Sequence, residues 1–121
     1  MDYDVSVSED STYILIDIHQ PMSNELGRRC GADAVALAEQ YGLNHYLFDS
    51  RGAPNIEDPF LNYDFAYKEM EGFDFPHNSR SALLVDPDDA SHNFMETVFL
   101  NAGYQVKLFT DKNEAIAWLN E

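Results

Sequence analysis

A serine that directly follows an apolar strand is the first group in this sequence that could do chemistry. The run 44–49 ends at Asp49, and Ser50, Arg51 and Gly52 follow at once; we call residues 49–52 the DSRG turn. A serine hydroxyl at a strand end can accept a phosphoryl group, and a helix N-terminus would stabilise the new dianion. The DSRG turn is therefore a candidate regulatory site. The alternative is a polar turn in which Arg51 pairs with one of the many carboxylates.

The remaining reactive side chains form no catalytic or metal-binding pattern. The four histidines lack the paired spacing of metal ligands. His92 follows Asp88 and Asp89, and we expect an exposed histidine beside an acidic capping turn. Cys30 lies on the apolar side of a predicted helix, where an inert buried thiol is typical. With no Gly-x-Ser-x-Gly elbow and no glycine-rich phosphate loop, we expect no catalytic residue, no metal and no cofactor.

Aromatic residues crowd into the segment 60–75 in a number that one face of a short helix cannot bury. They could pack on the sheet as core, form an exposed patch for dimerisation, or line an apolar pocket. A pocket of this kind would take a small apolar or lipid-like molecule. Its candidate lining residues are Phe60, Tyr63, Tyr67 and Phe73.

The charge of the chain is its most unusual bulk property. Asp and Glu number 22 against 7 Lys and Arg, which gives a net charge of -15 at pH 7. A basic surface is expected of proteins that bind nucleic acid or anionic membranes, so both functions are disfavoured. The excess of acid either serves solubility or forms an acidic face for a basic partner.

Length and composition predict a single domain over residues 1–121, located in the cytoplasm. A chain of 121 residues can bury its own core without a disulfide. Its one cysteine fits a reducing compartment. The N-terminal segment MDYDVSVSED lacks the pattern of a signal peptide. No apolar run approaches the ~20 residues that span a membrane, so we expect no membrane insertion.

The first half of the chain predicts a hairpin, a helix and a strand. Alternation over 3–7 predicts an edge strand, and the continuous apolar run 12–18 predicts a central strand with no solvated face. A helical period follows Pro21 and ends before Gly42, which suits the C′ position. The strand 44–49 comes next. The predicted apolar stripe of the helix consists of Leu26, Cys30, Ala34, Leu37, Ala38 and Tyr41.

The second half predicts a helix from Asp58, a strand at 81–86, a helix up to Gly103, a strand at 104–109 and a helix capped by Asp111. The order ββαβαβαβα predicts an α/β fold with four helices and a mainly parallel, mixed five-stranded sheet that opens with an antiparallel hairpin. Functional groups in such sheets collect at the carboxyl ends of the strands. Those ends carry Asp17-Ile18-His19, Asp49-Ser50-Arg51 and Asp86-Pro87-Asp88-Asp89.

This order resembles the SpoIIAA-like fold, which STAS domains and anti-anti-sigma factors share. The segments YILIDI, NHYLFDSRGA and SALLVDPDD, followed by the pattern G-Y-x-V-x-x-F-x-D-x-x-E-A-x-x-W-L, are similar to a group of small bacterial SpoIIAA-like proteins without an established activity. In anti-anti-sigma factors, a partner kinase phosphorylates the serine of an Asp-Ser-x-Gly motif after the third strand. The resemblance places Ser50 at that position, although Arg51 replaces the usual small residue.

The segment 82–119 also resembles the start of a response-regulator receiver domain. A receiver carries its phosphoacceptor aspartate on the strand that would come next, and the chain ends before one. We therefore expect shared βαβα organisation and no working receiver. A permuted receiver that uses Asp49 is a further alternative.

Two functions follow as expectations. The first is a non-enzymatic SpoIIAA-like module that acts through contact with a protein partner or as a homodimer, with Ser50 as its candidate switch. The second is a binder of a small apolar or lipid-like ligand in the aromatic-lined pocket.

Overall fold

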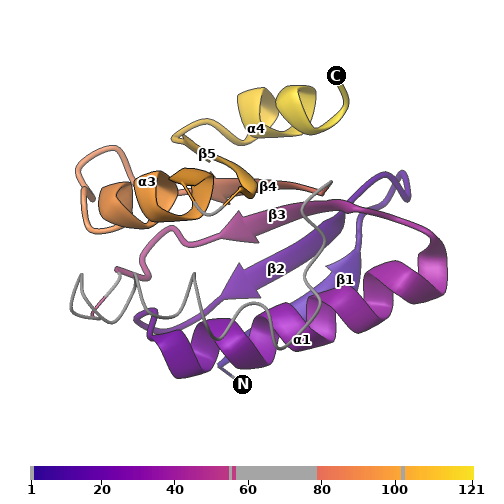
Figure 1. Ribbon diagram of the computed structural model, residues 1–121, viewed down its shortest axis with the longest axis horizontal. Helices are drawn as coiled ribbons and strands as arrows, with labels where there is room; N and C mark the ends of the chain where they lie inside the picture. Colours follow the sequence, from indigo (N-terminus) through magenta and orange to yellow (C-terminus); the bar gives the residue numbers. More distant parts are fainter. Residues whose placement is uncertain (1, 55, 57–78, 102) are drawn as a thin grey trace.

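Five strands form one mixed sheet in the part of the chain that the computed structural model describes, which is residues 2–54, 56, 79–101 and 103–121. They lie in the order β1-β2-β3-β4-β5; β1 is antiparallel to β2, and the other pairs are parallel (Figure 1). This confirms the predicted α/β class and the N-terminal hairpin. The strands are β1 (Tyr3–Val7), β2 (Ile14–Ile18), β3 (His45–Asp49), β4 (Arg80–Leu84) and β5 (Gln105–Phe109).

Three helices flank the sheet within the described residues: α1 (Asn24–Tyr41), α3 (Asn93–Asn101) and α4 (Lys112–Leu119). All three agree with helices that the sequence pattern predicts. The helix predicted from Asp58 lies outside the described residues, so four helices are not established. None of the described helices has the length and apolar character needed to cross a membrane.

Capping side chains explain where two of these helices begin and how the longest one ends. Ser23 caps α1, because its hydroxyl accepts a hydrogen bond from the Leu26 N–H at 3.1 Å. Asp111 caps α4 in the same way through the Asn113 N–H, as predicted. Gly42 ends α1 in the left-handed conformation, with φ of 67°, which confirms its predicted C′ role.

The two faces of the sheet bury separate apolar cores. Ile14, Ile16 and Ile18 of β2 point toward α1 and α3, as do Tyr46 and Val106. The opposite face packs on α4 and contributes Tyr13, Leu47, Ala82 and Leu84. Alternate residues of a strand point to opposite faces, so β2, β3, β4 and β5 supply both cores, whereas β1 contributes only to the core on the α1 side.

The predicted apolar stripe of α1 is wrong at its last member. Tyr41 is 54% exposed, whereas Val35, which the pattern left out, is buried. Tyr41 is the last residue of α1, where the chain turns away at Gly42 toward β3. Tyr41 is exposed although its spacing matches the stripe, because helical spacing does not show where along the helix the packing against the sheet ends.

Candidate functional site

The DSRG turn leaves β3 and is fastened by its backbone to the neighbouring strand. The Ser50 N–H donates to the Leu84 carbonyl at 2.8 Å, and the Ala53 N–H donates to the Ser50 carbonyl at 3.0 Å. The Gly52 N–H donates to Asp86 Oδ2 at 2.7 Å. Gly52 has φ of 75°, a conformation that glycine adopts at the least cost. The loop after β4 therefore holds the turn in one shape.

Two further contacts anchor the chain just after the turn. His92 Nε2 donates to the Ala53 carbonyl at 2.9 Å, and the Met22 N–H donates to the Pro54 carbonyl at 2.8 Å. The expectation that His92 is an exposed histidine is wrong, because it is 4% exposed. The segment after β3 packs over it, a tertiary contact that the acidic sequence around His92 does not reveal.

The side chain of Ser50 is buried and does not reach the surface of the protein. It is 2% exposed. A kinase could reach this hydroxyl only if the turn opened and released its hydrogen bonds to Leu84 and Asp86. Phosphorylation of Ser50 stays a prediction, and the geometry adds the requirement for that opening.

Arg51 folds back onto Asp49, the first residue of the turn. Its Nε and Nη2 atoms donate to the two carboxylate oxygens at 2.9 and 2.7 Å, and its backbone N–H donates to Oδ1 at 3.3 Å. Burial acts to raise the pKa of the Asp49 carboxyl, but the hydrogen bonds and charge of Arg51 outweigh it and hold this pKa below its usual value. The predicted pairing of Arg51 with a carboxylate is therefore present.

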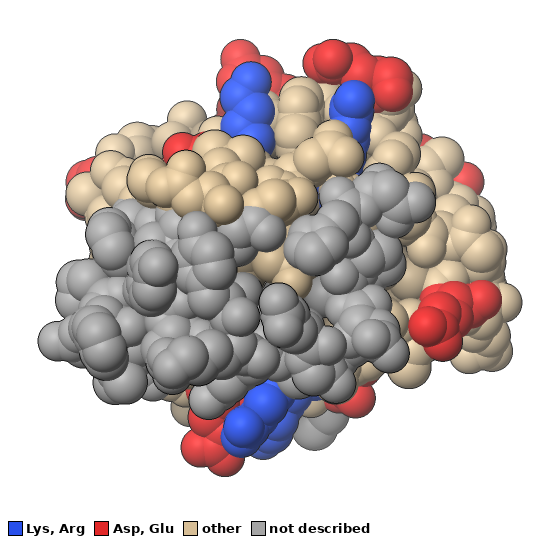
Figure 2. All heavy atoms as spheres, in the orientation of Figure 1, with Lys and Arg blue, Asp and Glu red and all other residues tan. Residues whose placement is uncertain are grey.

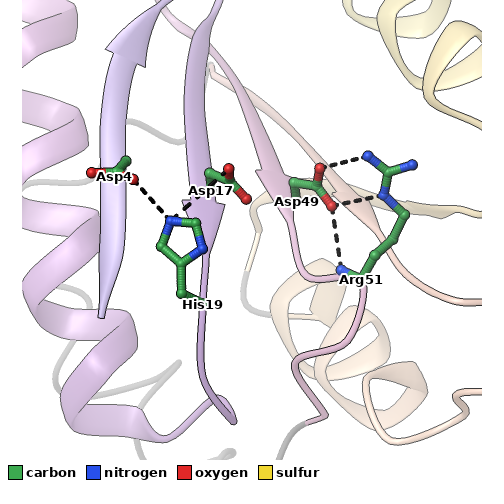
Figure 3. A network of polar contacts seen from close by, with 5 residues as sticks. All are labelled: Asp4, Asp17, His19, Asp49 and Arg51. Atoms are coloured by element: carbon green, nitrogen blue, oxygen red, sulfur yellow. Dashed lines mark hydrogen bonds and ion pairs between the residues drawn. The ribbon is translucent and has the colours of Figure 1, made fainter. Parts of the chain in front are cut away.

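Three aspartates stand in one row across the sheet (Figure 3). Strand register pairs Asp4 with Asp17 between β1 and β2, and Asp17 with Asp49 between β2 and β3. Paired residues share a face of the sheet, so their carboxylates project side by side. We call Asp4, Asp17 and Asp49 the aspartate row.

The aspartate row lies on the α4 face, and its members on β1 and β2 lie beyond the strands that α4 contacts. That helix packs over β3, β4 and β5. The side chains of Asp4 and Asp17 are 64% and 48% exposed, whereas Asp49 is only 14% exposed. The expectation that the run 12–18 has no solvated face is thus wrong at Asp17, since the helix on that side reaches only part of the sheet.

His19 lies at the exposed end of the aspartate row, beside Asp4. Its Nε2 atom lies 2.8 Å from Asp4 Oδ2 and 4.0 Å from Asp17 Oδ2, between the two carboxylates (Figure 3). Each end of the row thus has one basic side chain, His19 beside Asp4 and Arg51 on Asp49. Among contacts between described residues, Asp17, in the middle, has only the more distant one from His19.

The structure brings together some predicted site residues and leaves others untested. All four residues of the DSRG turn form one connected unit with Asp86. The candidate pocket residues Phe60, Tyr63, Tyr67 and Phe73 lie outside the described residues. No set of three or more histidine, cysteine or acidic side chains within the described part of the chain could hold a metal ion.

Sequence reasoning placed Asp17 and His19 with the DSRG turn at the carboxyl ends of the strands, but it missed Asp4 and the alignment of the three aspartates. The available signal was the hairpin: an aspartate in each predicted strand, on the side away from the apolar pattern of 3–7. Using it would have required the pairing register, which the sequence pattern alone does not give.

Comparisons with known proteins identify no relative: no family model matches the chain, and no match was found among curated proteins or solved structures. Function must therefore be argued from the geometry of the site and from the charge of the surface around it.

Proposed function

We propose that this protein is a non-enzymatic interaction module that binds a basic segment of a partner protein across the aspartate row. The observation that carries the proposal is the register of β1, β2 and β3, which aligns three carboxylates, two of them on strands that α4 does not cover. Such a row suits a cationic chain laid across β1 and β2, with its lysine or arginine side chains near Asp4 and Asp17.

Electrostatics within the sheet supports a cationic partner. Like charges on directly opposite residues destabilise a sheet. Arg51 compensates the charge of Asp49 at one end of the row, and His19 contacts Asp4 at the other end. A partner cation near Asp17 would relieve the remaining repulsion between the carboxylates. Binding of the partner would therefore also stabilise the sheet.

The charge of the whole chain favours the same kind of partner. The net charge of -15 attracts basic proteins over a long range and speeds their encounter. In Figure 2, acidic side chains appear at several places around the margin of the visible face, with few basic ones among them. Two copies that met through their aspartate rows would repel each other, which makes a homodimer through this surface the weaker alternative.

The SpoIIAA-like assignment belongs to this proposal. The order of the described elements and the mixed sheet with its antiparallel opening hairpin are compatible with it. In such a module, the DSRG turn borders the docking surface, because Asp49 belongs to both. Opening of the turn, with or without phosphorylation of Ser50, would free Asp49 from its present partners and alter the surface.

Affinity capture with a matched charge control tests the proposal. The tagged protein, the double variant Asp4→Asn/Asp17→Asn and the control Glu39→Gln/Glu121→Gln are incubated with lysate of the source cells. Both variants remove two exposed negative charges, but only the first alters the row. We expect a basic protein that the wild type and the control retain and the row variant loses. Equal retention by all three, or equal loss from both variants, would contradict a specific docking surface.

A further inference from the structure

The outer side of β1 is an open edge of the sheet. β1 stands first in the strand order, and no strand of the described residues lies on its other side (Figure 1). The His19 N–H donates to the Asp2 carbonyl at 2.9 Å, so the even-numbered residues of this segment direct their backbone groups toward β2. Because this direction alternates along an antiparallel strand, the odd-numbered residues direct theirs outward. The outward N–H and C=O groups belong to Tyr3, Val5 and Val7.

On the opposite edge of the sheet, a side chain already occupies an outward N–H group. The Val85 N–H donates to the Phe109 carbonyl, so the backbone groups of Leu108 face away from β4. The Leu108 N–H donates to Glu96 Oε2 of α3 at 2.7 Å. Lys107 is exposed on the same strand, and a lysine on an edge strand discourages pairing with another chain. Within the described residues, no side chain bonds in this way to the outward N–H groups of β1, which makes β1 the more available edge.

Contacts with α1 hold β1 in place while leaving its outward backbone groups unused. The side chains of its odd-numbered residues pack against the core on the α1 side. The Tyr3 hydroxyl donates to Asp33, and Arg29 Nη2 donates to Asp2 Oδ2 at 2.8 Å. The strand is therefore already formed when a partner arrives, so pairing with it requires little further ordering of this protein.

We propose that an extended, basic segment of a partner protein joins the sheet as an additional strand beside β1. Its backbone bonds to the outward groups of β1, and its side chains alternate between the two faces of the sheet. On the α4 face, a lysine or arginine lies beside Asp4, which is 64% exposed at the open end of the aspartate row (Figure 3). On the α1 face, the neighbours are Tyr3, Val5 and Val7, which suit apolar side chains. The inference rests on the proposed function for the charge of the partner and adds how the partner backbone is held.

A second copy of the chain suits this edge less well than a basic segment does. It would bring another Asp2 and another Asp4 to the joint, and each copy carries a net charge of -15. Acidic side chains on an edge strand repel an identical strand, whereas they attract a cationic one. The charge of the edge therefore favours a partner that alternates basic and apolar residues.

Amide hydrogen exchange with a designed peptide tests the proposal. The probe is acetyl-Lys-Val-Arg-Val-Lys-Val-amide, and the control, acetyl-Lys-Arg-Lys-Val-Val-Val-amide, has the same residues without the alternation. We expect millimolar probe to slow exchange of the Tyr3, Val5 and Val7 amides several-fold, and the control to leave them nearly unchanged. Equal effects of the two peptides, or no slowing with either, would overturn the proposal. Slowing that increases with protein concentration in the absence of peptide would assign the edge to a second copy and would also overturn it.

Methylation of the probe backbone separates strand pairing from attraction between charges. An N-methyl group on all basic residues, or instead on all valines, removes the N–H donors from one side of the extended peptide and leaves its charge unchanged. Only one side can face β1, so one of the two peptides should bind about tenfold more weakly or worse, and the other should bind like the probe. Loss with methylated valines indicates an antiparallel added strand, and loss with methylated basic residues indicates a parallel one.

The same peptides distinguish failure of strand pairing from failure of the aspartate-row surface. Equal binding of the two methylated peptides would overturn the strand pairing. If the variant Asp4→Asn/Asp17→Asn then weakened both peptides more than Glu39→Gln/Glu121→Gln did, docking on the row would still stand. Unequal binding that both variants leave unchanged would support the added strand and contradict the row as the docking surface.

Discussion

Arg51 binds both carboxylate oxygens of Asp49, two residues before it, at 2.9 and 2.7 Å. The charge of Asp49, at one end of the aspartate row, is therefore paired within the protein. The acids left for a partner are therefore Asp4 and Asp17, on the strands that α4 does not cover. Arg51 is 47% exposed, so its guanidinium also forms part of the surface that a partner would meet.

The first prediction concerns Arg51→Met. We expect a loss of about 1 kcal/mol in the free energy of unfolding at pH 7, because the mostly buried Asp49 carboxylate loses its counter-charge. The pKa of Asp49 is lowered in the folded state, so the pair stabilises above the usual aspartate pKa and this contribution disappears as pH falls through the folded value. The difference between wild type and variant should therefore shrink between pH 7 and pH 3 in urea unfolding. A difference that is constant over this range would contradict the assignment.

Ser50 gives a second prediction, which separates a buried serine from an exposed switch. Ser50→Ala should change the free energy of unfolding by less than about 1 kcal/mol. Ser50→Asp should cost about 3 kcal/mol or more, because it places an unpaired charge in a buried position next to Asp49 and Asp86. Urea unfolding of both variants measures this. If Ser50→Asp is as stable as the wild type, the turn opens without cost and the switch hypothesis gains support.

Gly52 gives a third prediction about the shape of the turn. Gly52→Ala should cost about 1–2 kcal/mol, because φ of 75° strains a residue with a Cβ atom. The space around an added Cβ is open, with nothing within 4 Å, so the cost is one of backbone conformation alone. Gly52→Asn should cost less, since asparagine adopts this region more readily. Equal costs for the two variants would mean that steric contact, not conformation, sets the requirement.

A fourth prediction concerns the join between β1 and α1, where the Tyr3 hydroxyl donates to Asp33. This hydrogen bond, together with burial, raises the pKa of Tyr3 from its usual 10.0 to about 12. A raised folded pKa means that the stabilisation is complete below pH 10 and is lost as pH rises toward 12. Asp33→Asn should bring the titration of Tyr3 back toward 10, which selective ¹³C NMR of the tyrosine rings would show. A Tyr3 that titrates identically in both proteins would rule out this contact.

Local sequence signals were sufficient for most of the described fold. Gly42 and Asp111 were correctly predicted as caps because capping depends on a few neighbouring residues. The edge strand 3–7 was correct because its alternation has a clear period of two. Tyr41 was misplaced because burial depends on which part of a helix lies over the sheet, and helical spacing contains no such information.

The candidate site was predictable only in part, for a physical reason. Arg51 and Asp49 are two residues apart, so their pairing could be expected from the sequence. The aspartate row depends on the register of three strands, and its Asp4–Asp17 pair is set by a hairpin turn in which Ser11 adopts a φ of 59°. The burial of Ser50 and His92 depends on the loop after β4 closing over the DSRG turn. Such long-range contacts leave little trace in local pattern.

Carboxyl-to-amine cross-linking of the captured complex tests the proposed docking surface most directly. A zero-length reagent joins a carboxylate to a lysine in contact with it, and peptide mass spectrometry identifies the joined residues. The proposal predicts that lysines of the partner become linked to Asp4 and Asp17. Links confined to acids of α1, such as Glu25 and Glu39, would place the partner on another surface and contradict the proposal.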